Sequence, residues 1–348
     1  FKTNITQSEE AKDETSSSFA ASASLEASAR YLFFSAKLTG SISNKKDSSS
    51  TKDSKYSVEH TVDVTVHAVQ DDMPAGLARM LAILTKSIDL SVAAGLALCG
   101  MTAALMNGAG VPLVVIVPAV TVLGALLGAV NGILVWKLDI PSIVVTLGTM
   151  TIYRGIIFLM TDGKWVNAHE MTDGFKAFPR AVILGLPVMS WIALAIVAAF
   201  AVLVSRTPLG RALFAVGGNP NAAVYTGLSV GRTQFFAFVI SGALAGLAGY
   251  LWIARYAVAY VDVAGGFELD VVAACVIGGI SIAGGIGSVG GAVLGAIFIG
   301  VVKNALPVIG ISPFWQMAIS GTAIILAVAF NAAQSRAKGR MILKEVAA

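Results

Sequence analysis

Histidine and cysteine are the side chains best able to bind a metal ion or to act in nucleophilic catalysis, and this chain has 3 histidines and 2 cysteines. His60 and His67 fall on opposite faces of a predicted strand without a third ligand, which favours solvated side chains over a metal site. Cys99 and Cys275 each stand in an apolar run, where cysteine is usually a small buried hydrophobe. His169 stands in a predicted loop, and no candidate nucleophile accompanies it that it could activate as a general base. We therefore predict no catalytic residues, no metal site and no cofactor in this chain, and we do not expect an enzyme.

Two other chemistries are disfavoured in the apolar part of the chain. The run Gly284-Gly-Ile-Gly-Ser-Val-Gly-Gly lacks the Lys-Ser/Thr pair of a phosphate-binding loop, so it does not predict nucleotide binding. A proton-coupled carrier needs ionisable groups deep in its spans, and the candidates are Arg154, Arg255 and Lys303, with no Asp or Glu except at span ends. An ion channel would show a repeated filter or a charged ring, and neither is visible.

The chain that must position these residues has two very different parts, which meet near residue 88. Of its 348 residues, 56% are hydrophobic and 13% are charged, too few polar residues to cover a soluble globule of this size. We count ten Lys/Arg and eleven Asp/Glu before residue 88, and fourteen and nine after it, giving net charges of −1 and +5. No basic tract with interleaved aromatic residues occurs, so nucleic acid is not an expected partner.

Residues 1–87 predict a small soluble β-rich (α+β) segment. Valine alternates with polar residues over Tyr56–Val69, which indicates a half-buried strand, and a weaker strand signal covers Ala29–Ser43. Asp71-Asp72-Met73-Pro74 then predicts the start of a helix over Ala75–Lys86. The sequence from Val66 onward resembles a family of small bacterial β-rich proteins known only as a domain of unknown function.

Residues 88–348 predict an all-α polytopic membrane domain of about eight spans, because eight apolar stretches approach the length needed to cross a bilayer. Re-entrant segments are the alternative for some of these stretches. The predicted spans are Leu90–Met106, Leu113–Trp136, Ile140–Met160, Val188–Val204, Thr233–Ala259, Val271–Ile286, Val289–Leu306 and Phe314–Phe330. Glycines recur every four residues on several of them, which predicts close helix packing at Gly124, Gly128 and Gly132, at Gly242 and Gly246, and at Gly287, Gly291 and Gly295.

Basic residues cluster in the connection that holds Arg206, Arg211 and Arg232 and again after residue 335. The excess of positive charge in cytoplasmic loops places both clusters on the cytoplasmic side. Threading the spans from there puts the N-terminal segment and the C-terminus in the cytoplasm.

The connection between the fourth and fifth predicted spans is the most informative stretch of the chain. Its centre reads Gly218-Asn219-Pro220-Asn-Ala222-Ala223-Val-Tyr225-Thr-Gly227. Asn219 and Pro220 predict a helix start, and Gly227 predicts a stop after one short amphipathic turn. We expect a short helix presented to the cytoplasm.

This loop, followed by Ile240-Ser-Gly-Ala-Leu-Ala-Gly-Leu-Ala-Gly-Tyr, resembles the coupling region of bacterial ABC monosaccharide importers, in the permease family of the ribose and xylose systems. The resemblance begins at Ile88-Asp-Leu-Ser-Val and continues through Val276-Ile-Gly-Gly-Ile-Ser-Ile-Ala-Gly-Gly. It implies that the short helix docks on an ABC ATPase subunit, which binds the ATP. It also implies a second permease chain, identical or not, and a periplasmic sugar-binding protein, with the spans surrounded by lipid in the bacterial inner membrane.

Within that family, Trp136-Lys-Leu-Asp-Ile-Pro-Ser-Ile and Gly163-Lys-Trp-Val-Asn-Ala-His are most similar to rhamnose permeases. The resemblance therefore implies rhamnose or another 6-deoxyhexose or pentose as substrate, with autoinducer-2, ribose or xylose as alternatives. Sugar hydroxyls need hydrogen-bonding groups along the path, and the candidates are Asn131, Thr146, Thr149, Thr151 and Ser281, although helix–helix hydrogen bonds are the commoner role.

The chain departs from the family before residue 88, where the family usually has one or two further spans. The segment that resembles the β-rich family stands there instead, so the chain resembles a fusion that lacks those spans. A second reading follows from this departure: a truncated, transport-incompetent permease that anchors a cytoplasmic interaction module.

Overall fold

The structure, a computed structural model, describes residues 73–308 together with residues 315, 318, 321, 322 and 325. Contacts divide the chain into two units, Phe1–Thr65 and Val66–Ala348, and every described residue belongs to the second. The predicted strands of the N-terminal segment, the C-terminal basic cluster and most of the predicted span Phe314–Phe330 lie outside the described residues. Those three expectations stay predictions.

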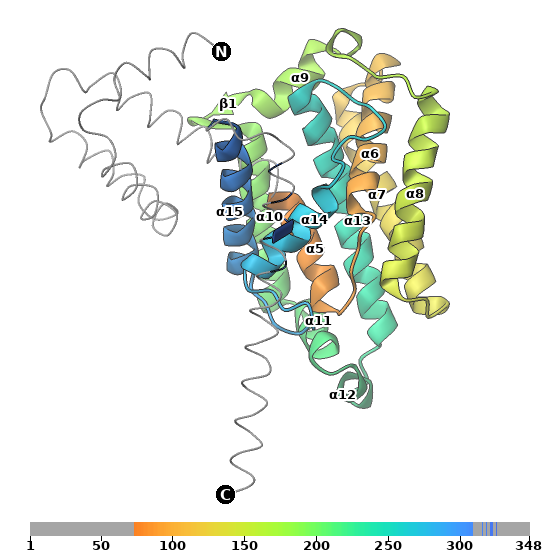
Figure 1. The fold of residues 1–348 in the computed structure, drawn as a ribbon, viewed down its shortest axis with the longest axis vertical. Helices are drawn as coiled ribbons and strands as arrows, with labels where there is room; N and C mark the ends of the chain where they lie inside the picture. Colours follow the sequence, from red (N-terminus) through yellow and green to blue (C-terminus); the bar gives the residue numbers. More distant parts are fainter. Residues whose placement is uncertain (1–72, 309–314, 316–317, 319–320, 323–324, 326–348) are drawn as a thin grey trace, which may run out of the picture. The chain divides into compact units, whose positions relative to one another are not determined.

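The described residues form a bundle of helices with one small hairpin (Figure 1). The elements are α5 Met73–Leu84, α6 Val92–Gly108, α7 Leu113–Lys137, α8 Ser142–Thr161, η1 Ala168–Glu170, α9 Asp173–Arg180, β1 Val182–Ile183, β2 Leu186–Pro187, α10 Val188–Arg206, α11 Pro208–Gly218, α12 Pro220–Tyr225, α13 Val230–Tyr256, α14 Phe267–Ile277 and α15 Val289–Val308. The strands β1 and β2 pair antiparallel.

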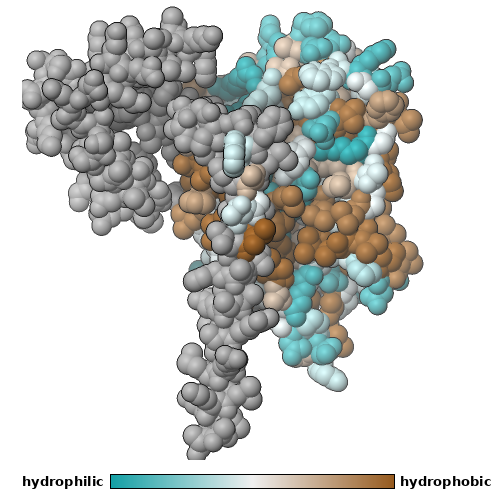
Figure 2. Space-filling view, viewed as in Figure 1, coloured by the Kyte–Doolittle hydropathy of each residue, from teal (hydrophilic) through white to brown (hydrophobic). Residues whose placement is uncertain are grey.

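Four of the described helices are long and apolar enough to cross a membrane: α7, α8, α10 and α13. The helix α6 and residues Val289–Ala305 of α15 are shorter apolar helices. Hydrophobic side chains gather across the middle of the described helices, whereas hydrophilic ones gather toward the ends at which α9 and α12 lie (Figure 2). Val122 and Leu126, 57% and 58% exposed, are large hydrophobic side chains near the middle of α7. An apolar belt between two polar ends is what a bilayer solvates, so the bundle is of the membrane type.

The apolar stretch Val271–Ile286, predicted as a span or a re-entrant segment, is not one continuous helix. The helix α14 ends at Ile277 after 11 residues, and a turn follows before α15 begins. Gly279 and Gly284 both have a φ of +81°, a left-handed conformation that glycine adopts without steric cost. Hydropathy measures only how apolar a run is, so it did not detect that the glycines reverse the chain here.

The helix predicted over Ala75–Lys86 is present as α5, but it packs differently from the expectation. It lies within the bundle against α13, α14 and α15, and Leu77 and Leu84 are 1% and 0% exposed. Arg79 is also fully buried, and its Nη1 donates to the carbonyl oxygen of Glu268 at the start of α14. By its contacts α5 thus belongs to the helical unit, although the boundary at residue 87 assigned it to the soluble segment. The boundary itself remains a prediction.

The helices α7 and α13 pack backbone against backbone along a seam formed by Gly124, Gly128, Gly242 and Gly246. A Cβ atom on Gly124 would overlap the carbonyl oxygen of Gly242, and one on Gly246 would overlap the carbonyl oxygen of Val120. Close approach of this kind is the usual role of small residues in membrane helices, and it confirms the glycine-stripe prediction for these two helices.

Candidate functional site

The short helix expected in the connection between the long spans is present as α12. The side-chain oxygen of Asn219 accepts a hydrogen bond from the backbone N–H of Ala222 at 3.1 Å, and Pro220 occupies the first helical position. The helix ends at Tyr225, and Gly227 follows with a φ of +84°. The cap, the proline and the glycine therefore have the local roles that the sequence predicted.

The helix α12 presents apolar side chains outward. Val224 and Tyr225 are 58% and 91% exposed, whereas Ala223 is buried against the bundle. It lies with α11 beyond the end of the long helices, at the lower end of the bundle in Figure 1. An exposed aromatic residue on a capped helix outside the apolar belt is suited to contact a partner protein.

Two of the five candidate path residues attach to the linker Thr85–Ser91, which connects α5 and α6. The Asn131 amide donates to Ser91 Oγ at 2.8 Å, and the Thr146 hydroxyl donates to the carbonyl oxygen of Ile88 at 3.2 Å. Both contacts join different elements, as polar residues in membrane helices commonly do.

The other three candidate path residues do not join this group. Thr149 and Thr151 each donate to the carbonyl oxygen four residues earlier in α8, at 3.1 and 3.2 Å. Ser281 lies in the turn after α14, where its N–H donates to the carbonyl oxygen of Ile286 at 2.9 Å. No single polar path formed by all five is seen among the described residues.

The centre of the polar group is Asp89, which the sequence analysis left out of its candidate sites. Its Oδ1 accepts from the N–H and the hydroxyl of Ser91 at 3.0 and 2.7 Å, and its Oδ2 lies 3.5 Å from the Ser241 hydroxyl. Asp89 is 3% exposed. The Asp-x-Ser sequence just before an apolar run was a usable signal, because Asp side chains commonly accept a hydrogen bond from the backbone N–H two residues later.

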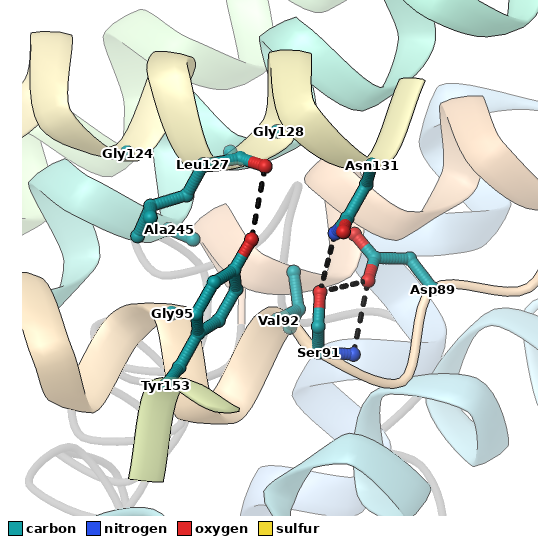
Figure 3. A pocket seen from close by; sticks show the side chains of 11 residues that line it. Asp89, Ser91, Val92, Gly95, Gly124, Leu127, Gly128, Asn131, Tyr153 and Ala245 are labelled. Carbon is teal, nitrogen blue, oxygen red and sulfur yellow. Dashed lines mark hydrogen bonds between the residues drawn. The ribbon is translucent and has the colours of Figure 1, made fainter. Parts of the chain in front are cut away.

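A small cavity of about 10 Å³ opens beside this polar group (Figure 3). Asp89, Ser91, Asn131 and Tyr153 line it, and the glycines of α7 and α13 form much of its wall. Asn131 Oδ1 is buried and has no hydrogen-bond partner in the described part of the chain. A space of this size holds about one water molecule, so the cavity is too small for a monosaccharide.

We expect Ser91→Ala to destabilise the bundle by about 1–3 kcal/mol, because the Asn131 amide and one carboxylate oxygen of Asp89 each lose a buried hydrogen bond. The thermal midpoint of the detergent-solubilised chain measures this. Thr151→Ala is the matched control, because the Thr151 hydroxyl bonds only within its own exposed helix face. Equal midpoints for the two variants would contradict the prediction.

Two of the charges considered for proton coupling have structural partners instead. Arg154 donates to the carbonyl oxygens of Val261 and Val263 at 2.5 and 2.8 Å, so it ties α8 to the loop before α14. Lys303 Nζ lies 2.7 Å from a carboxylate oxygen of Asp270, which joins α15 to α14. Within the described residues, no group of three His, Cys, Asp or Glu side chains could hold a metal ion.

An apolar helical bundle with glycine-packed helices and an exposed short helix at one end has the features of a multi-pass membrane transport subunit. Residues 75–328 match a family described as the permease component of the branched-chain amino acid transport system, and the chain belongs to this family. It is therefore a transporter subunit and not an enzyme.

Curated relatives agree with the family. The chain is 38% identical over 248 residues to a ribose import permease protein of Haemophilus influenzae, covering 71% of this chain and 77% of the relative. It is 34% identical over 279 residues to an autoinducer 2 import system permease protein of Salmonella paratyphi B, covering 80% of each. No solved structure matches the chain.

The N-terminal part matches a second family over residues 1–87, described as a protein of unknown function, DUF2589. The two matches overlap from residue 75 to residue 87, a stretch that contains most of α5. The resemblance to the permease family and the resemblance of residues 1–87 to a family of unknown function are thus confirmed. Nothing in these matches points to rhamnose, and the β-rich character of residues 1–87 stays a prediction.

Proposed function

We propose that this chain is the membrane-spanning permease subunit of an ATP-driven ABC importer for a monosaccharide, with rhamnose or another 6-deoxyhexose or pentose as substrate. The observation that carries the proposal is α12, a capped helix with exposed Val224 and Tyr225 that an ATPase subunit can contact. The named transport roles of the relatives, ribose and autoinducer 2 import, support a small polyhydroxylated substrate.

The translocation path is proposed to lie between two permease chains. The cavity inside the contact of α6, α7, α8 and α13 holds about one water molecule, so a sugar needs another route. The exposed apolar faces of α7 and α8 offer surface for either lipid or a second permease chain. A periplasmic sugar-binding protein is the proposed partner at the end opposite α12. The end with α12, the N-terminal segment and the C-terminus are assigned to the cytoplasm of the bacterial inner membrane.

Uptake into vesicles tests this function. We expect vesicles that contain the chain, its ATPase and its binding protein to accumulate one of four radiolabelled probes: L-rhamnose, D-ribose, D-xylose or autoinducer-2. Uptake should exceed the value without ATP at least tenfold and should disappear with a non-hydrolysable ATP analogue. L-rhamnose uptake would establish the favoured substrate, and preference for another probe would replace it.

The alternative function is a transport-incompetent membrane anchor for the N-terminal segment. The second family match over residues 1–87 favours it, because this segment stands where the permease family usually has further spans. Assembly with the ATPase but no ATP-dependent uptake of any probe would support the anchor and contradict the importer.

A further inference from the structure

Three backbone segments meet at one point near α12, which we call the glycine junction: Leu84 at the end of α5, Gly217 near the end of α11, and Gly285 in the turn after α14. The N–H of Gly285 donates to the carbonyl oxygen of Leu84 at 3.0 Å. A Cβ atom on Gly217 would overlap that carbonyl oxygen and would lie 2.5 Å from the Gly285 nitrogen. The three backbones are therefore in direct contact, with no side chain between them.

Two of these segments are interruptions of apolar helices. The linker Thr85–Ser91 separates α5 from α6, and Lys86 in it has a φ of +60°. The glycine turn separates α14 from α15, and Gly284 in it has a φ of +81°. Segments outside the regular helical hydrogen-bond pattern are where backbone angles change at least cost, so both can act as hinges.

The linker also reaches the polar group in the bundle. The N–H of Ile88 donates to Ser142 Oγ at 3.1 Å, and its carbonyl oxygen accepts from Thr146. One residue further lie Asp89 and its bonds to Ser91, beside the water-sized cavity (Figure 3). A displacement of Leu84 would therefore reach α7 and α8 through this hydrogen-bonded chain.

The third segment leads directly to α12. Asn219 is the C-terminal cap of α11 and also the N-terminal cap of α12, so only one residue separates the two helices. Gly217 is buried two residues before that cap, and the neighbouring Leu213 and Val216 are 0% exposed. A shift of α12 must thus move the backbone of Gly217 against Leu84 and Gly285.

We propose that the glycine junction transmits displacement of α12 to the two interrupted helices, and that Gly217 is a positioning residue for transport. This inference rests on the proposed importer function. Closely packed interfaces switch between discrete arrangements instead of deforming smoothly, so backbone contact passes a small shift on without absorbing it.

Two adjacent glycines give a matched pair of variants. We expect Gly217→Ala to lower the number of probe molecules taken up per ATP hydrolysed at least tenfold, while ATPase co-purification stays unchanged. Gly218→Ala should leave that ratio within twofold of wild type, because a Cβ atom on Gly218 would meet nothing within 4 Å. Equal ratios for the two variants would overturn the inference.

Hydrogen–deuterium exchange of the wild-type complex decides the question if Gly217→Ala fails to accumulate in the membrane. The N–H of Gly285 donates to the carbonyl oxygen of Leu84 at 3.0 Å, so movement of the glycine junction should change the exchange of this amide. Binding of a non-hydrolysable ATP analogue to the ATPase should change the exchange rate of the peptide that contains Gly285 at least tenfold. An unchanged exchange rate would overturn the inference. Wild-type vesicles that take up none of the four probes would instead remove the importer function on which it rests.

Discussion

Replacing Tyr225 with aspartate is expected to weaken binding of the chain to its ATPase subunit strongly. Tyr225 is 91% exposed on α12, outside the apolar belt, where no neighbour in the bundle needs it. Central aromatic residues of an interface commonly contribute about 2–4 kcal/mol, which corresponds to a loss of roughly 30- to 1,000-fold in affinity. Co-purification of the two subunits in detergent, titrated with ATPase, measures the loss.

Leu184 supplies the matched control for this variant. It lies on the β1–β2 hairpin, is 88% exposed, and is likewise a large hydrophobic residue outside the long helices. Leu184→Asp should bind the ATPase as the wild type does. A loss of binding in both variants, or in neither, would contradict the assignment of α12 as the docking helix. A substitution at Gly227, which follows α12, would not test docking cleanly, because its φ of +84° makes any larger residue strained.

The second large effect is expected at the α7–α13 seam. Gly242→Leu should prevent accumulation of the folded chain, because even a Cβ atom at this position would overlap the carbonyl oxygen of Gly124. Overpacking of a core usually costs about 1–3 kcal/mol, and the obstacle here is rigid backbone instead of a side chain that could rotate away. Size-exclusion chromatography of a fluorescently tagged chain measures the folded fraction.

Gly155→Leu in α8 is the control for the seam. Gly155 is an exposed glycine within an apolar helix, and a Cβ atom there would meet nothing within 4 Å. This variant should accumulate as the wild type does, because an exposed apolar helix face has room for a leucine side chain. Loss of the folded chain in Gly155→Leu would show that any added bulk is harmful, and it would remove the special role of the seam.

The sequence by itself determined the features that depend on neighbouring residues along the chain. Leu113–Trp136 and Val188–Val204 predicted α7 and α10 within about two residues, because a long apolar run in a bilayer must satisfy its backbone hydrogen bonds as a helix. Asn219, Pro220 and Gly227 predicted α12 because caps and stops act over a single turn. The resemblance to the permease family also followed from short motifs of neighbouring residues.

Only the tertiary structure decided what depends on contacts between distant segments. The apolar run from Val271 breaks at Ile277, where the glycines can turn and α15 packs against the chain, and hydropathy carries no such information. Asp89 becomes the centre of a polar group only when α7 and α13 bring Asn131 and Ser241 beside it. Gly217 is one glycine among 36 in the sequence, and its distinction from Gly218 arises from the backbones of Leu84 and Gly285. The contacts of Gly217 leave no pattern along the chain, in contrast to the four-residue glycine spacing of the α7–α13 seam, because they depend on which irregular segments meet and not on which residues are adjacent.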